Sequence, residues 1–267
     1  MAIPTLNTIE HQNVLKRLIS LSQSANNVQL HPAGLEYTSL MICFLKHNVT
    51  AAECVLRLYD LFGDNYFPAT VGYSIVRPMF EIDVTAHYIG TDRSALSTRY
   101  IEYKSVFNKQ QMDACGKHRS SKNSNWREAM EMAWQHDFEV KQKDINSEFD
   151  AVRLRYESHN KKVKVVKNWS GKSIRQMAIE VDHEEAYDLF YADLSSFTHA
   201  DVRLADRFLR LNSEGISWSS RSHDPDIGGV FRYADIFLDC FLRFFGREFN
   251  IWPENSVGEC WIKDTLN

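Results

Sequence analysis

Residues 71–89 constrain the fold more than any other stretch, because they are apolar on two sides of a helix and charged between those sides. With about 100° per residue, one face carries Val71, Ile75, Met79, Ile82, Ala86 and Ile89. The roughly opposite face carries Tyr73, Val76 and Phe80. Since both faces need apolar neighbours, the stretch predicts the central helix of a multi-helix bundle.

Two polar stripes run along the same helix. Arg77, Glu81 and Tyr88 form the first stripe, and Asp83 and His87 form the second. An Arg four residues before a Glu is in the weaker order for helix stabilisation, and burying two charges is costly unless further hydrogen bonds satisfy them. The pair therefore fits three interpretations: a structural salt bridge inside the bundle, a ligand-binding or catalytic cleft, or a solvated surface pair.

Helix-breaking residues are scarce in this chain. Six prolines and eleven glycines are few for 267 residues, and strand-like alternation is rare. We therefore expect an all-α fold, a multi-helix bundle with one long projecting helix and little or no β-structure. The expected helices cover residues 8–21, 34–47, 51–62, 68–89, 94 onward, 171–181, 184–194 and 229–245. Residues 211–219 are expected to be extended, and Pro78 either begins the central helix or kinks it.

Large apolar residues recur at helical spacing over about thirty residues after the polar segment 117–124. They are Trp126, Met130, Trp134, Phe138, Ile145, Phe149, Val152 and Tyr156. One continuous helix of this length would be about 45 Å long, more than a compact bundle requires. It either packs along the domain's own flank or forms a homodimer through the helix at 125–158. We thus expect one helical domain over 1–267, with its core at about 8–115 and 168–250 and a long-helix excursion at about 120–160.

Composition resembles that of soluble globular proteins, with 44% hydrophobic and 25% charged residues. The net charge of −4 argues against a protein that coats nucleic acid through its overall charge. The basic run at 159–167 is either a solvated loop or a contact to phosphate. Five cysteines without CxxC spacing indicate neither a disulfide framework nor a zinc knuckle. Without a signal-peptide pattern or an uninterrupted apolar span, we expect a cytoplasmic protein without membrane contact.

His199 is the candidate general base. Thr198 and Asp201 resemble a capping box, which places His199 in the first turn of a helix, where the neutral imidazole is favoured. A neutral imidazole exchanges protons near pH 7, although a histidine at a helix junction can also be purely structural. The predicted catalytic residues are His199 as the base, Arg77 as a contact to phosphate, and Glu81, which orients Arg77 or the substrate. The predicted ligand-binding residues beside this group are Tyr88, Tyr191 and Ser195.

Other kinds of site are not indicated. The segment from Trp169 to Ser173 lacks the first glycine of a phosphate-binding loop, so a nucleoside triphosphatase is not expected. There is no H-E-x-x-H motif, and the adjacent His183 and Glu184 point apart on a helix. We therefore predict no metal site and no cofactor.

Three segments resemble a bacterial family known only as a domain of unknown function. They are Arg77-x-x-Phe80-Glu81, Trp169-x-Gly171-Lys172-Ser173-Ile174-Arg175 and Tyr187-x-x-x-Tyr191-x-x-x-Ser195-x-x-x-His199. The resemblance covers about residues 40–210 and implies a helical fold that brings the Arg, Glu, Tyr and His elements together.

The chain is also similar in general character to HEPN-type helical ribonucleases, which are common in phage defence and toxin–antitoxin pairs. Their signature is an Arg, then four to six residues, then a His. Arg153 and His159 have this spacing, but chance supplies it in a chain of this composition, and Leu154 stands where a polar residue usually follows the Arg.

Two functions fit these observations. The first is an enzyme that acts on RNA or a nucleotide, in bacterial defence or a toxin–antitoxin pair. The alternative is a non-catalytic ligand-sensing or protein-interaction module, in which the Arg–Glu–His cluster is structural.

Overall fold

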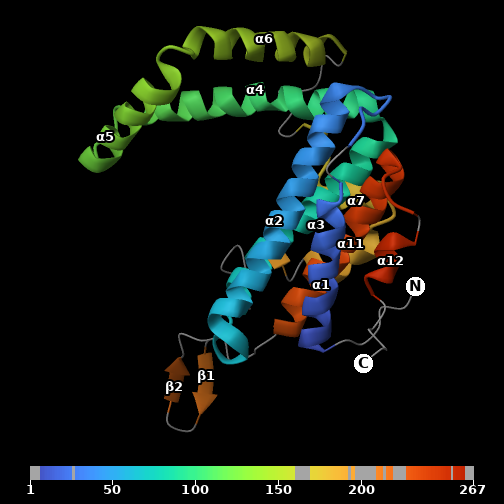
Figure 1. Ribbon diagram of the computed structural model, residues 1–267. Coiled ribbons are helices and arrows are strands. Elements are labelled where there is room, and N and C mark those ends of the chain that lie inside the picture. Colours follow the sequence, from blue (N-terminus) through green and yellow to red (C-terminus); the bar gives the residue numbers. More distant parts are fainter. Residues whose placement is uncertain are drawn as a thin grey trace. The chain divides into compact units, whose positions relative to one another are not determined.

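The computed structural model describes residues 7–25, 28–159, 169–191, 194–195, 209–212, 215–218, 227–253 and 255–261 (Figure 1). Helices dominate these residues, so the all-α prediction is confirmed. The chain divides into two compact units, one formed by residues 1–93 with 174–267 and the other by residues 94–173. The second unit begins earlier than the excursion expected at about 120–160.

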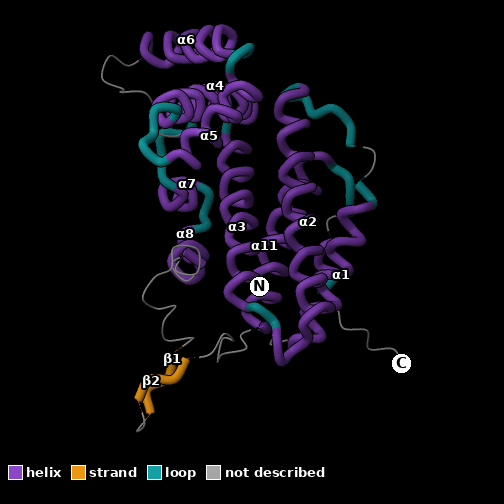
Figure 2. The backbone as a smooth tube through the Cα atoms, turned by 90° about the vertical axis from the view of Figure 1, so that its left-hand side faces the viewer, coloured by secondary structure: helices purple, strands orange, loops and turns teal. Residues whose placement is uncertain are grey.

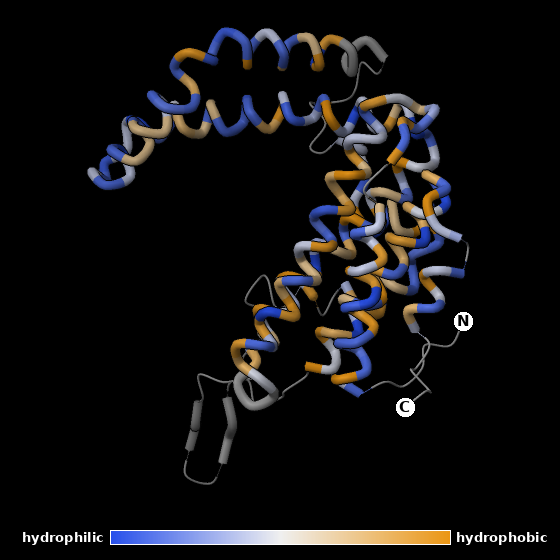
Figure 3. The backbone as a smooth tube through the Cα atoms, in the orientation of Figure 1, coloured by the Kyte–Doolittle hydropathy of each residue, from blue (hydrophilic) through white to orange (hydrophobic). Residues whose placement is uncertain are grey.

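The first unit is a helical bundle built around α11 (Ile227–Phe249). This helix packs against α1 (Thr8–Gln23), α2 (Leu35–Tyr66) and α3 (Ala69–Thr91). Hydrophobic residues gather where these helices face one another (Figure 3). Four phenylalanines of α11 are almost fully buried there, namely Phe231, Phe237, Phe241 and Phe245. The smaller α12 (Ser256–Glu259) contacts α1 and α11.

Helix α3 is buried on two sides, as its sequence predicts. Met79 and Ala86 on one face, and Val76 and Phe80 on the other, have no exposed surface. On the first face, Ile75 and Ile82 are half-buried, and Val71 is 48% exposed near the start of the helix. Pro78 lies inside α3 without ending it. Helix α3 approaches α11 closely, since a Cβ at Gly72 would lie 2.8 Å from a methyl carbon of Val230.

The sequence-based division of residues 34–62 into two helices is wrong. Helix α2 continues through residues 48–50, because no glycine or proline interrupts it there, although the Thr50 hydroxyl is a possible cap for a helix that begins at residue 51. The break comes later, at Gly63, whose φ of 59° lies in the left-handed region that glycine adopts readily.

A segment of short helical turns lies along α3. It consists of α7 (Ile174–Glu180), α8 (Glu184–Ala186) and the π-helical turn η2 (Tyr187–Tyr191). Both α7 and α8 lie beside α3 in the view of Figure 2, and α7 packs directly on it. A π-helical turn widens the helix by one residue and is frequent at functional sites. This segment supplies the partners of the polar residues of α3.

The second unit contains most of α4 (Arg93–His118), followed by α5 (Ser124–Ala133), the π-helical turn η1 (Trp134–Phe138) and α6 (Gln142–His159). The single long helix expected over 126–156 is therefore wrong, because the chain leaves the α-helical path between α5 and α6. At this point the Trp134 ring packs 3.2 Å from the Cβ position of Gly116 and beneath the guanidinium of Arg119. Arg119 also pairs with Glu131, which fixes α5 against α4.

The expected extended segment is a two-stranded antiparallel hairpin, β1 (Leu209–Asn212) and β2 (Gly215–Trp218), in which Leu209 pairs with Trp218. Within the described part of the chain, one helical segment, Leu35–Gly63 of α2, is long and apolar enough to cross a membrane. Core helices of bundles meet the same criterion, and α2 packs against α1, α3 and α11.

Candidate functional site

The first polar stripe of α3 is closed by a tyrosine from η2. Arg77 Nε donates to Glu81 Oε1 (2.9 Å), and Arg77 Nη2 donates to the Tyr191 hydroxyl (3.0 Å). The same hydroxyl donates to Glu81 Oε1 (3.0 Å), and the guanidinium carbon lies 5.2 Å from the tyrosine ring centroid. Burial and the charge of Glu81 raise the pKa of Tyr191. The three groups thus satisfy one another and attach η2 to α3.

Arg77, Glu81 and Tyr191 thus form a triangle of hydrogen bonds. The other predicted site residues do not all join this triangle. Tyr88 is buried two turns further along α3, about 10 Å from Glu81 along the helix axis. Ser195 is half-buried, and the adjacent Leu194 has no exposed surface. His199 lies outside the described residues. The structure therefore brings together Arg77, Glu81 and Tyr191, which the sequence had assigned to one site.

The second polar stripe of α3 meets His183, which follows α7. His183 Nε2 lies 3.1 Å from Asp83 Oδ2, and His87 Nδ1 lies 3.3 Å from Asp83 Oδ1. The imidazole rings of His87 and His183 have centroids 4.6 Å apart. Asp83 is 1% exposed, whereas both histidines reach the surface in part. Sequence reasoning predicted no metal site, yet these three residues bring their ligand atoms within 4.8 Å of one another.

A hydrogen-bonded turn places His183. Its backbone N–H donates to the Ala178 carbonyl (2.7 Å), and the Asp182 N–H donates to the Ile179 carbonyl (3.4 Å). These are the two bonds of a Schellman motif at the end of α7. Asp182 takes the left-handed position of the motif, with φ 59°, where glycine is the usual residue. The turn carries the chain from α7 to His183, which faces Asp83.

Backbone carbonyls fix the orientation of both imidazoles. His183 Nδ1 lies 2.7 Å from the Val181 carbonyl, and His87 Nδ1 lies 2.9 Å from the Asp83 carbonyl. Because a carbonyl only accepts, each Nδ1 carries the hydrogen. Burial opposes ionisation of Asp83, but its interactions with the nearby imidazoles of His183 and His87 outweigh burial and lower its pKa. Burial likewise opposes the charged form of His183, and Asp83 outweighs that effect and raises its pKa.

A surface pocket of about 400 Å³ adjoins this cluster. Its lining residues are His87, Gly90, Thr91, Glu180, Val181, Asp182, Phe244, Arg247 and Glu248. Arg247 is exposed, and none of the described residues forms a hydrogen bond or ion pair with it. The pocket thus combines one imidazole, one available guanidinium and three carboxylates.

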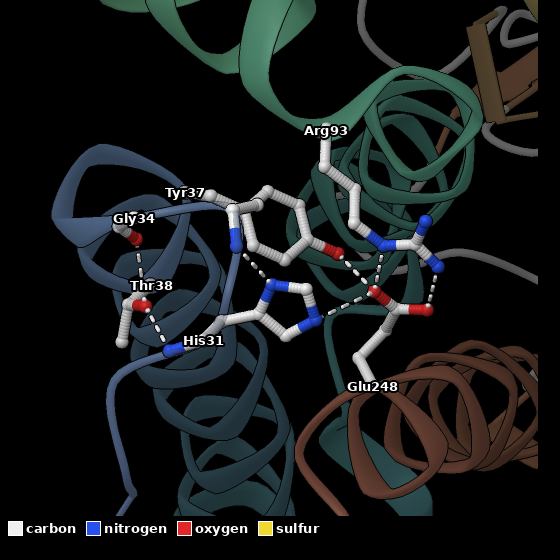
Figure 4. A network of polar contacts seen from close by, with 7 residues as sticks. His31, Gly34, Tyr37, Thr38, Arg93 and Glu248 are labelled. Atoms are coloured by element: carbon white, nitrogen blue, oxygen red, sulfur yellow. Dashed lines mark hydrogen bonds and ion pairs between the residues drawn. The ribbon is translucent and has the colours of Figure 1, made fainter.

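Glu248, on the pocket wall, is the centre of a separate network (Figure 4). Arg93 donates to both of its carboxylate oxygens (2.6 and 2.8 Å), and the Tyr37 hydroxyl donates to Oε2 (2.6 Å). His31 Nε2 lies 3.7 Å from the same oxygen. Burial works against the ionised form of Glu248, but the bonds from Arg93 and Tyr37 outweigh it and lower its pKa. The network joins α2, the start of α4 and α11.

A second Asp–His pair is structural. His11 Nδ1 lies 2.7 Å from Asp235 Oδ2, and both side chains are at most 1% exposed. Burial lowers the pKa of His11 and raises that of Asp235, so both groups favour their neutral forms. Neither residue lines the pocket beside His87, and the pair stabilises the contact between α1 and α11.

A family model described as a family of unknown function, DUF5677, matches residues 41–216. The match includes α3 and the segment from α7 to η2, and hence Asp83, His87 and His183. Arg247 and Glu248 lie beyond it. No curated protein and no solved structure matches the chain.

Proposed function

The chain belongs to DUF5677, a family of unknown function, and we propose that it is an enzyme that hydrolyses a phosphate ester of RNA or a nucleotide in the pocket beside His87. The single observation behind this proposal is that His87, a member of the Asp83–His87–His183 cluster, and Arg247 line one pocket. We further propose that this activity belongs to bacterial defence or a toxin–antitoxin pair in the cytoplasm, as the resemblance to helical ribonucleases suggests.

Each part of the pocket has a role in this reaction. A guanidinium binds two phosphate oxygens at once, which suits Arg247 because the described residues leave it unpaired. The cluster activates a water molecule, whose oxygen bonds to phosphorus while the ester P–O bond breaks. The cluster takes one proton from the water and gives a proton to the leaving oxygen.

Arg77 and Glu81 have a different role in this proposal from the catalytic one that the sequence suggested. To bind phosphate, Arg77 would have to give up its bonds to Glu81 and Tyr191. Removing one member of such a pair leaves the other charge partly buried without its partner. We therefore propose that Arg77, Glu81 and Tyr191 hold η2 on α3. This closed triangle is also the observation that favours the alternative function, a non-catalytic ligand-sensing or interaction module.

Hydrolysis assays test the proposal. Purified protein is incubated with labelled RNA oligonucleotides and with nucleoside phosphates, and products are separated on gels or measured as released phosphate. His87→Gln should lower the rate about 100-fold or more, the usual contribution of one acid–base group. Arg247→Ala should lower it by about 100-fold, because the transition state loses a charged hydrogen-bond donor. His47→Gln and Arg57→Ala are matched controls, because both residues are exposed on α2 away from the pocket.

Unchanged rates in both pocket variants would refute this site. Binding of a nucleotide without turnover, lost in the Arg247→Ala variant, would refute hydrolysis and support the sensing alternative. Melting temperatures of all four variants should stay close to that of the wild type, since each replaced side chain is at least partly exposed.

A further inference from the structure

We infer that Asp83, His87 and His183 bind one divalent transition-metal ion, of which Zn²⁺ is the best-fitting example. This inference deepens the proposed function, since it concerns the same cluster, but metal binding can be measured without any substrate. Two imidazoles and one carboxylate are a ligand set that Zn²⁺ and its neighbours in the first transition row accept.

The contact between Asp83 and His183 requires a positive charge. His183 Nδ1 carries its hydrogen toward Val181, so in the neutral ring Nε2 presents a lone pair to the carboxylate. The two atoms lie 3.1 Å apart. Two lone pairs at this distance repel, and either a proton or a metal cation between them removes the repulsion. A proton gives a structural imidazolium–carboxylate pair, whereas a metal ion gives a binding site.

The distances fit a shared ion. Zinc ligands at about 2.0–2.2 Å from the metal lie about 3.3 Å from one another in a tetrahedral site. The separation of Asp83 Oδ2 and His183 Nε2 is close to this value, and the whole set lies within 4.8 Å. Three protein ligands leave a fourth position for water or substrate, the arrangement of catalytic rather than structural zinc.

The surroundings of the cluster also favour a cation over a proton. Metal-binding histidines usually donate their second ring N–H to a carbonyl or carboxylate, and both His87 and His183 donate Nδ1–H to a backbone carbonyl. Asp83 Oδ1 is buried without a hydrogen-bond partner, because the hydrogen of His87 Nδ1 points to the Asp83 carbonyl. Glu180 and Asp182 line the adjacent pocket and add negative charge that a bound cation would offset before a phosphate could enter.

Zinc titration of metal-free protein tests the inference. The full chain is treated with a chelator, dialysed and titrated with ZnCl₂ by calorimetry, and bound metal is counted by elemental analysis. We expect one ion per chain and binding at micromolar zinc. Loss of an outer-shell partner alone weakens metal sites about 10–100-fold, so His183→Gln and Asp83→Asn should weaken binding at least as much. His47→Gln should bind like the wild type, because His47 is an exposed histidine of α2.

A second readout covers the case in which Asp83→Asn fails to fold. Zinc should raise the melting temperature of the wild type and not that of His183→Gln, whose residue is only partly buried. The absence of bound ion, or equal affinity in the wild type and His183→Gln, would overturn the inference and leave the imidazolium–carboxylate pair. Zinc binding without hydrolysis of any substrate would refute the proposed function alone, and hydrolysis by a protein that binds no zinc would refute the metal site alone.

Discussion

Glu248 joins α11 to Tyr37 of α2 and to Arg93 within the first unit. Replacing it should destabilise that unit by an amount that depends on Tyr37. The Glu248→Ala variant removes the acceptor of the Tyr37 hydroxyl and both acceptors of Arg93. Tyr37 has no exposed surface, so its hydroxyl cannot find water in place of the carboxylate without rearrangement. Arg93 is 42% exposed and can be solvated.

The exposed fractions of Tyr37 and Arg93 set the expected loss in free energy of unfolding. A buried hydroxyl that loses its partner costs about 1–3 kcal/mol, and an ion pair as exposed as that of Arg93 contributes about 0.2–1 kcal/mol. Glu248→Ala should therefore lower the free energy of unfolding by about 1–4 kcal/mol. In a Tyr37→Phe background the unsatisfied hydroxyl is absent, so the same substitution should cost only the share of the Arg93 pair, about 0.2–1 kcal/mol.

Urea denaturation followed by circular dichroism measures the four proteins of this double-mutant cycle. The pKa of Glu248 is lowered below 4.5 in the folded protein. The stabilisation is therefore complete above pH 4.5 and is lost as the pH falls through the folded-state pKa. The difference in free energy of unfolding between wild type and Glu248→Ala should shrink in this acidic range. It should stay constant between about pH 6 and 8, where a glutamate with an ordinary pKa is already ionised.

Two results would contradict this account of Glu248. One is an equal cost of Glu248→Ala in the wild type and in the Tyr37→Phe variant, which would show that the hydroxyl does not depend on the carboxylate. The other is a stability difference that does not change as the pH falls below 4.5.

Two further predictions concern η2 and the second unit. Tyr191→Phe removes the hydroxyl that bonds to Arg77 and should cost about 1–2 kcal/mol, whereas Tyr187→Phe, whose ring stacks on Tyr191, should cost little in the same urea assay. Equal losses would contradict the role of the triangle. The homodimer proposed through residues 125–158 is supported by Trp126 and Leu154, each 62% exposed. Trp126→Glu with Leu154→Glu should then lower the mass seen by light scattering, and a monomeric wild type would refute the dimer.

The sequence predicts helices where periodicity is strong and end signals agree. It correctly predicts α3, which has buried residues on both of its apolar faces, and α11, whose phenylalanines from 231 to 245 are buried. It divides α2 wrongly, because Thr50 carries a capping signal that the surrounding helix overrides. It also misses the break at Trp134, since that turn depends on packing against Gly116 of another helix. Local signals fail where a tertiary contact decides the path of the chain.

The contrast between local signals and tertiary contacts also decides which residues of the candidate site the sequence predicts. The i,i+4 spacings of Arg77 with Glu81 and of Asp83 with His87 are visible in the sequence. Their place between two apolar faces of one helix predicts that each pair needs a further partner. Which residues supply the partners is not visible, because His183 depends on a turn in which Asp182 adopts a conformation typical of glycine.

The segment from His183 to Tyr191 contacts both polar stripes of α3, in the reverse order of the stripes along that helix. As the chain advances from His183 to Tyr191, its partners on α3 move back from Asp83 and His87 to Glu81 and Arg77. The segment therefore runs antiparallel to α3 and is held at both ends by polar contacts. A ligand that binds at His183 would act on a segment whose far end is fixed by Tyr191. Loosening the triangle with Tyr191→Phe should then weaken zinc binding only slightly if the two contacts are independent, and markedly if the segment orders as one piece.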